Sequence, residues 1–131
     1  MSNSKTARFK ELVELYGLTK DSFHKDSRGF IIVTREGIER IQGVLGLQVS
    51  FAPVNEFTYV GEGYFTLKAW TTVVREDGST FKVESFGESS PKNNRNPYPI
   101  AMAEKRALSR VVLKAAGMYE LGVYGEDEMN D

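Results

Sequence analysis

The clearest pattern of apolar and polar positions predicts a helix over residues 99–117. Pro99 suits the first turn of a helix, where its missing N–H leaves no hydrogen bond unmade, and Gly117 is a common stop. Between these two residues the chain is rich in Ala, Leu and Val. The face that we expect to pack on the core carries Leu108, Val111, Val112 and Ala115.

The other face of this helix is basic. With about 3.6 residues per turn, Arg106, Arg110 and Lys114 form one i, i+4 stripe. Ala103 and Ala107 lie beside the stripe, so a partner can approach the helix backbone closely there. We therefore predict a helix with an apolar back and a cationic front.

Alternating apolar and polar residues predict an antiparallel sheet in the middle of the chain. Pro53 favours an edge, a bulge or a break near the start of this region, and Asp77-Gly78 is a typical hairpin turn. The strongest strand directly precedes that turn. The segments expected to be extended are residues 47–51, 57–60, 64–75 and 80–86.

The N-terminal third predicts two further helices. Residues 5–16 carry one apolar stripe, and Thr34 can cap a helix that runs to about Val44. Residues 20–29 are polar and we expect them to be irregular, whereas residues 30–33 form a short apolar run typical of a strand or of a buried segment leading into the next helix.

The order of elements predicts an α+β fold. It consists of an antiparallel three-stranded β meander (a β-β-β-α core) packed by a long C-terminal helix, with N-terminal helices. The sheet face away from the core is mixed, and we expect it to be partly exposed, in contact with a loop or a neighbouring subunit rather than lining a ligand pocket. Its residues are Tyr64, Thr66, Lys68, Trp70 and Lys82.

Length and composition indicate one domain of an ordinary globular kind, with 131 residues, 40% of them hydrophobic and 27% charged. No apolar run is long enough to span a membrane, and the first residues lack the apolar segment of a secretion signal. The absence of cysteine excludes disulfides and thiolate metal sites and fits a cytoplasmic setting.

The formal net charge of −1 hides an uneven distribution. Residues 92–114 carry a local charge of +5, which favours a phosphate polyanion as partner, although a solvated face of Lys and Arg is the ordinary alternative. Residues 120–131 contain acidic and no basic residues. We predict a single domain over residues 1–119 and a mobile acidic tail over 120–131; a sharper hypothesis is that the tail competes for the cationic surface.

Catalytic chemistry has little support in the sequence. His24, the only histidine, lies in a polar stretch and is expected at the surface, and no zinc, Walker A or dinucleotide motif occurs. Glu84 and Glu88 offer a weak alternative, a metal-dependent nuclease pair, but acids so placed usually face solvent. We predict a protein that is not an enzyme and needs no metal or cofactor.

Binding of single-stranded nucleic acid needs cations along the backbone and aromatic rings for the bases. The candidates for backbone contacts are Lys68, Lys82, Lys92, Arg95, Lys105, Arg106, Arg110 and Lys114. The candidates for base stacking are Tyr64, Trp70 and Tyr98, although such residues more often pack within a fold. Nothing in the pattern indicates readout of base sequence, because phosphate contacts position a strand without specifying it.

Residues 103–117, AEKRALSRVVLKAAG, resemble the helix signature of phage single-strand annealing proteins of the Erf and Sak types, A-E-T-x-A-I-x-R-A-L followed by glycine. Leu108 stands for Ile, Lys105 replaces Thr, and Val111-Val112 replace Ala-Leu. The eukaryotic annealing mediator of homologous recombination has a similar Lys-Arg-Ala-Leu core. The positions that match the phage pattern are Ala103, Glu104, Ala107, Arg110 and Gly117.

The resemblance covers residues 30–117 and is strongest over 64–117. It implies a core that assembles into rings or filaments, binds single-stranded DNA by its backbone in a groove between sheet and long helix, and anneals complementary strands without ATP. Arg110 takes the place of the helix arginine that contacts DNA. Ser109 replaces the mediator's preceding lysine, which leaves Lys105, Arg106 and Lys114 as neighbouring cations.

The sequence thus predicts single-stranded DNA binding and ATP-independent annealing in recombination or repair, through backbone contacts in a cationic groove of an oligomeric protein. The alternative is an α+β interaction or assembly module whose mixed sheet face binds proteins. In that alternative the cationic helix faces a carboxylate-rich partner or the acidic tail of the same chain.

Overall fold

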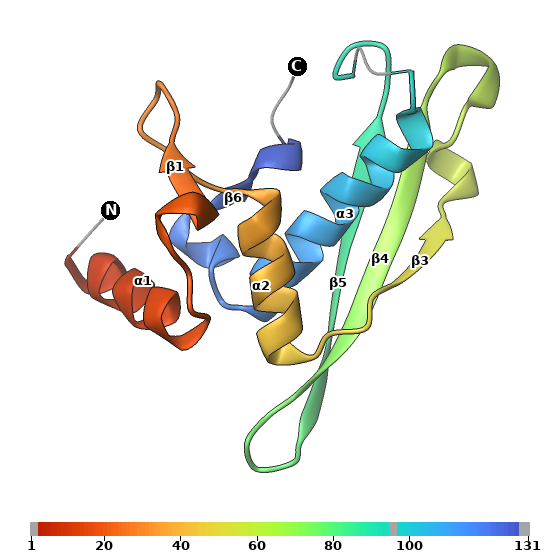
Figure 1. The fold of residues 1–131 in the computed structure, drawn as a ribbon. Coiled ribbons are helices and arrows are strands. Elements are labelled where there is room, and N and C mark those ends of the chain that lie inside the picture. The colour runs from red at the N-terminus through yellow and green to blue at the C-terminus, as the bar shows by residue number, and fades with distance from the viewer. Residues whose placement is uncertain (1–2, 95–96, 129–131) are drawn as a thin grey trace.

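The computed structural model describes residues 3–94 and 97–128, which form an α+β fold with two three-stranded sheets (Figure 1). The helices are α1 (Asn3–Leu15), α2 (Arg35–Leu45) and α3 (Pro99–Ala115). The strands are β1 (Phe23–Lys25), β2 (Ile31–Val33), β3 (Ser50–Pro53), β4 (Phe65–Val74), β5 (Thr80–Ser89) and β6 (Tyr124–Gly125). The predicted fold class is confirmed.

The larger sheet has the order β3-β4-β5 and is antiparallel throughout. Its main unit is the long β4–β5 hairpin, whose turn contains Gly78 at a φ of 86°, and whose turn end projects beyond α2 in Figure 1. Successive side chains of β4 point to opposite faces. Ala69, Thr71 and Val73 are buried toward α3, whereas the even-numbered residues lie on the other face.

Helix α3 lies directly on β5, and one glycine makes this approach possible. A Cβ atom added at Gly87 would overlap the Ala103 carbonyl oxygen and the Ala107 backbone nitrogen. Ala103 and Ala107 are fully buried as a result. The small residues of α3 therefore accommodate the chain's own strand, and the prediction that an external partner approaches the helix there is wrong.

The smaller sheet, which the sequence did not predict, pairs two strands from the N-terminal third of the chain with one from near the C-terminus. It has the order β1-β2-β6, with β1 and β2 antiparallel and β2 and β6 parallel. Residues 20–29, expected to be irregular, contain β1. Residues 120–128 pack on the body of the protein, with Val123 completely buried, so the prediction of a mobile tail is wrong for this part of the segment.

The main core lies where α1, α2 and the end of α3 meet. Leu12, Ile41, Val112 and Met118 are almost completely shielded from solvent. Thr34 caps α2 as predicted, accepting a hydrogen bond from the backbone N–H of Gly37 at 3.2 Å. Within the described residues, no helix combines the length and apolar character needed to cross a bilayer.

The contact between α3 and β5 makes a direct prediction about stability. Gly87→Ala should lower the free energy of unfolding by roughly 1–3 kcal/mol, because the new methyl group meets backbone atoms that cannot turn aside. Gly43→Ala is the matched control: it adds the same methyl group to α2 in open space and should raise stability by up to about 1 kcal/mol. Urea denaturation measures both, and equal stabilities of the two variants would contradict the packing described here.

Candidate nucleic-acid interface

Arg106, predicted to lie on an exposed cationic face, is 2% exposed. Its Nε donates to the Asp127 carbonyl oxygen at 3.0 Å, and its Nη1 donates to the Glu88 carbonyl oxygen at 2.9 Å. Asn93 accepts two further hydrogen bonds, at 3.0 Å on its side-chain oxygen and 2.6 Å on its carbonyl oxygen. Arg106 therefore fastens the end of β5, the following loop and the C-terminal segment together, and is not available to a phosphate in this structure.

Arg110 is shared between two carboxylates and a strand. Its Nη1 donates to the Phe86 carbonyl oxygen at 2.7 Å, and its guanidinium contacts Glu88 at 3.1 and 3.2 Å and Glu128 at 2.8 Å. Burial alone would lower the pKa of Arg110, but the hydrogen bonds and charges of Glu88 and Glu128 outweigh it, so the pKa is raised. The side chain keeps 21% of its surface exposed.

The cationic stripe of α3 closes the free edge of β5. In an antiparallel sheet every second residue of an edge strand turns its backbone groups away from its neighbour. Four residues of a helix rise about 6 Å, and two residues of a strand rise about 6.6 Å, so an i, i+4 stripe matches these carbonyls. The side chain–carbonyl pairs are Arg106 with Glu88, Arg110 with Phe86, and Lys114 with Glu84 at 3.2 Å.

The prediction of an open, un-neutralised groove along this stripe is therefore wrong. The charge count over residues 92–114 omitted Glu88 and Glu128, which lie outside that window and pair with Arg110. Of the remaining candidates near α3, Lys92 is exposed in the loop and Lys105 is half-buried on the helix. Arg95 lies outside the described residues.

The opposite face of the sheet brings three of the predicted residues together. The Nζ atoms of Lys68 and Lys82 each lie 5.8 Å from the centre of the Trp70 ring, one from β4 and one from β5. Glu84, directly across from Trp70 in the register, joins both lysines at 2.7 and 3.3 Å. Hydrogen bonds from these lysines lower the pKa of Glu84, which stays ionised at neutral pH.

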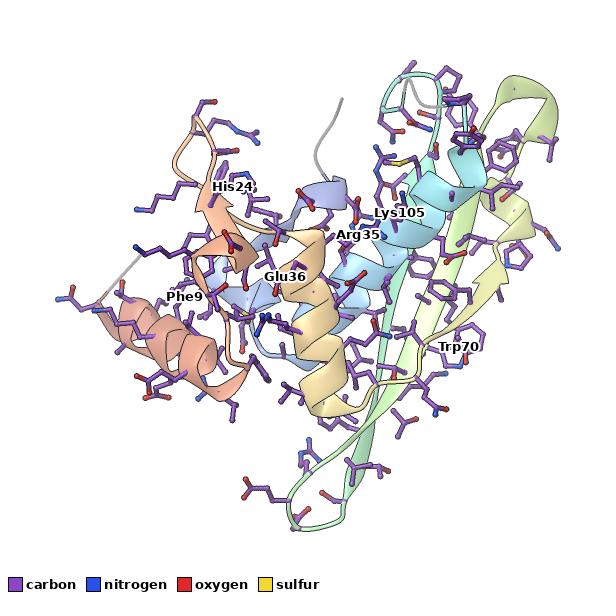
Figure 2. The ribbon with its side chains drawn as sticks, viewed as in Figure 1. Phe9, His24, Arg35, Glu36, Trp70 and Lys105 are labelled. Atoms are coloured by element: carbon purple, nitrogen blue, oxygen red, sulfur yellow. The ribbon has the colours of Figure 1, made fainter. Side chains whose placement is uncertain are left out.

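Phe86 extends the aromatic surface and was missed in the sequence. It pairs with Lys68 across the hairpin and is 47% exposed on the same face. The register that follows from the Asp77-Gly78 turn would have placed it there. A pocket of about 360 Å³ is lined by Trp70 and by Ser50 at the start of β3. Figure 2 shows Trp70 on the β3–β4 side of the molecule, away from α1 and α2.

The two tyrosine candidates lie elsewhere. Tyr64 packs edge-to-face on Tyr59, with ring centres 6.3 Å apart, six positions before Trp70 along the chain. Six strand residues span about 20 Å, so the rings of Tyr64 and Trp70 do not form one stacking surface. Tyr98, 67% exposed, directly precedes α3.

The carboxylates named for the nuclease alternative have other partners. Glu84 contacts Lys68 and Lys82, and Glu88 contacts Arg110. Across residues 3–94 and 97–128, no group of three His, Asp or Glu side chains comes together in a way that could hold a metal ion. The described residues therefore offer no support for metal-dependent cleavage.

Comparison of the sequence with models of known protein families and with curated proteins finds no match. The assignment of function therefore depends on the geometry of the chain and on the resemblance of residues 103–117.

The role of Arg106 predicts a large difference between two neighbouring substitutions. Arg106→Met should lower the free energy of unfolding by about 3 kcal/mol, because each carbonyl left without a donor away from water costs roughly 1–3 kcal/mol. Lys105→Met, at the adjacent half-buried position, should change it by less than about 0.5 kcal/mol. Chemical denaturation followed by circular dichroism compares them, and a negligible effect of Arg106→Met would show that the network is not structural.

Proposed function

We propose that this protein binds single-stranded DNA on the open face of the β3-β4-β5 sheet and promotes annealing of complementary strands without ATP. One observation carries the proposal: Trp70 lies on a sheet face that α3 does not cover, with two lysine ammonium groups each 5.8 Å from the centre of its ring. A partly exposed aromatic ring beside cations is what a flexible strand of stacked bases and phosphates requires.

The arrangement suits a strand whose sequence does not matter. Every base has a π face that can stack on Trp70 or Phe86, while Lys68 and Lys82 attract the phosphates on either side. Glu84 holds both lysines beside the ring and offsets part of their charge before a strand arrives. The affinity for single-stranded DNA should therefore be moderate, should depend little on base sequence, and should fall as the salt concentration rises.

The resemblance of residues 103–117 supports DNA as the partner but not the position of the contact. Helix α3 serves to close the edge of β5, and we assign the first contact with DNA to the sheet instead. The open sheet face of one chain can hold only a short stretch of a DNA strand. Annealing would therefore require several copies of the protein side by side, in a ring or filament. Such a protein would work in the cytoplasm, associated with the nucleoid when bound to DNA.

A second function, protein assembly, is favoured by an apolar surface at the N-terminal end of α3. Phe57, Val60 and Ile100 are each more than half exposed. Val60 and Ile100 line a pocket of about 300 Å³ whose surface is almost entirely apolar, and Phe57 directly precedes Thr58, another of its lining residues. Clustered exposed apolar residues mark interaction sites more often than scattered ones do. This apolar surface is distinct from the open sheet face that carries Trp70, Lys68, Lys82 and Phe86 (the Trp70 face), so one chain can use both.

Truncation of the Trp70 ring tests the binding face. Trp70→Ala should weaken binding of a fluorescein-labelled oligothymidylate by roughly 10- to 100-fold, the loss expected from one stacked base, and should slow annealing in parallel. Leu15→Ala, which truncates an exposed apolar side chain on α1 rather than on this sheet, should leave the affinity unchanged. Fluorescence anisotropy measures both, and unchanged affinity in the Trp70 variant would remove this face from the proposal.

The lysines are tested by the salt dependence of the same affinity. Lys68→Ala and Lys82→Ala should each reduce the slope of log affinity against log salt concentration by about 0.7. Lys10→Ala on α1 should not change it. Glu84→Gln should strengthen binding, because it removes the charge that both lysines now share. If the Lys10 variant alters the slope as much as the other two, binding is a general charge effect and not a property of this face.

A further inference from the structure

The acidic segment near the C-terminus binds Arg110, which the sequence analysis assigned to DNA, and Arg35, which it did not. The Glu126 side chain accepts a hydrogen bond from the Arg35 backbone N–H at 2.6 Å, and Asp127 pairs with the Arg35 guanidinium at 3.1 Å. Glu128 accepts from Arg110 Nε at 2.8 Å and from the Gly125 backbone N–H at 2.7 Å. Figure 2 labels Arg35 at the start of α2.

Each arginine of α3 divides its donors in the same way. Arg106 and Arg110 use Nη1 to hold carbonyl groups of β5. Both turn the Nε edge of the guanidinium to the acidic segment: Arg106 to the Asp127 carbonyl oxygen at 3.0 Å and Arg110 to the Glu128 carboxylate. Displacing residues 126–128 would therefore expose two Nε donors without breaking the contacts that close the strand edge.

The environment of Glu128 has the properties of an anion site. The side chain is only 5% exposed, and its two oxygens face one guanidinium and one backbone N–H, both of which also bind phosphate oxygens. A pocket of about 270 Å³ begins beside Glu128 and Arg110. Phe30 and Tyr124 line it, packed edge-to-face with ring centres 5.5 Å apart, so a base next to a bound phosphate has aromatic walls to contact.

We propose that Glu126–Glu128 occupies a second phosphate-binding site, formed by the Nε edges of Arg106 and Arg110, the Gly125 N–H and Arg35, and that the DNA strand displaces it. The inference rests on the proposed function and adds its regulation. The segment is an intramolecular competitor that keeps the affinity of the protein for single-stranded DNA low. A DNA strand that is first held on the sheet face beside Trp70 supplies phosphates at high local concentration and displaces the segment. The negative charge of the segment matters for this role, whereas its packing does not.

The test compares two pairs of substitutions with the same change in net charge, made in the full chain. Asp127→Asn with Glu128→Gln keeps the side-chain shapes and removes the charges that face the arginines. Its affinity for oligothymidylate should rise roughly 5- to 150-fold, the usual range for coupling between two sites. Glu104→Gln with Glu120→Gln removes two exposed charges elsewhere and should leave the affinity nearly unchanged.

The outcomes separate this inference from the proposed function. Loss of binding in Trp70→Ala together with equal affinities of wild type and both charge variants overturns the competitor and leaves the binding face intact. Equal gains in the two charge variants also overturn it, because they indicate a general effect of net charge. If neither the wild type nor any variant binds the oligonucleotide, the proposed function itself fails.

A second measurement decides the matter if the Asp127 and Glu128 variant does not fold. In the wild-type protein, nuclear magnetic resonance follows the backbone amides of Gly125 and Arg35, which donate to the acidic segment. Saturation with oligothymidylate should shift both amides as phosphate replaces carboxylate. Unchanged amide resonances at saturation would show that the segment stays in place, and would overturn the proposal.

Discussion

The arrangement of this protein depends on the row of helix cations that binds the outward carbonyls of one edge strand. Arg106, Arg110 and Lys114 repeat every four residues, and the carbonyls they reach repeat every two. The two spacings agree to within about 1 Å. Gly87 permits the helix backbone to come close enough for this match. The contact closes β5 against pairing with another strand and leaves the opposite sheet face open.

Once this edge is closed, the cations of α3 and those beside Trp70 form two distinct groups. The arginines of α3 hold backbone carbonyls, and Arg110 is further neutralised by Glu88 and Glu128. The lysines around Trp70 share a single carboxylate, and their side chains remain 35% and 53% exposed. The lysines beside Trp70 can exchange Glu84 for a phosphate at little structural cost. The arginines of α3 can bind a phosphate only through their Nε atoms, which the C-terminal segment covers.

Local patterns were sufficient to predict the elements whose partners are near in sequence. The Asp77-Gly78 turn and the alternation around it correctly predicted the hairpin, and Thr34 correctly marked the start of α2. The same alternation placed Trp70 and the two lysines on the outer face. The smaller sheet could not be predicted in this way, because β6 has two residues and its partner β2 lies near the other end of the chain.

The position of Arg106 could not be predicted for a similar reason. An arginine on a helix is normally exposed, and only partners from three separate segments, at Glu88, Asn93 and Asp127, make its burial possible. A charge count within one window does not contain those partners. A cationic stripe is therefore better evidence for a nucleic-acid site when a structure shows that its donors are unoccupied.

The most direct test of the account uses the fluorescence of Trp70, the only tryptophan in the chain. If bases stack on its ring, addition of oligothymidylate quenches the tryptophan emission to saturation, with the same midpoint as the anisotropy of the labelled oligonucleotide, and added salt reverses both. Binding that is seen by anisotropy while the tryptophan emission stays unchanged would contradict the assignment of the open sheet face as the binding surface.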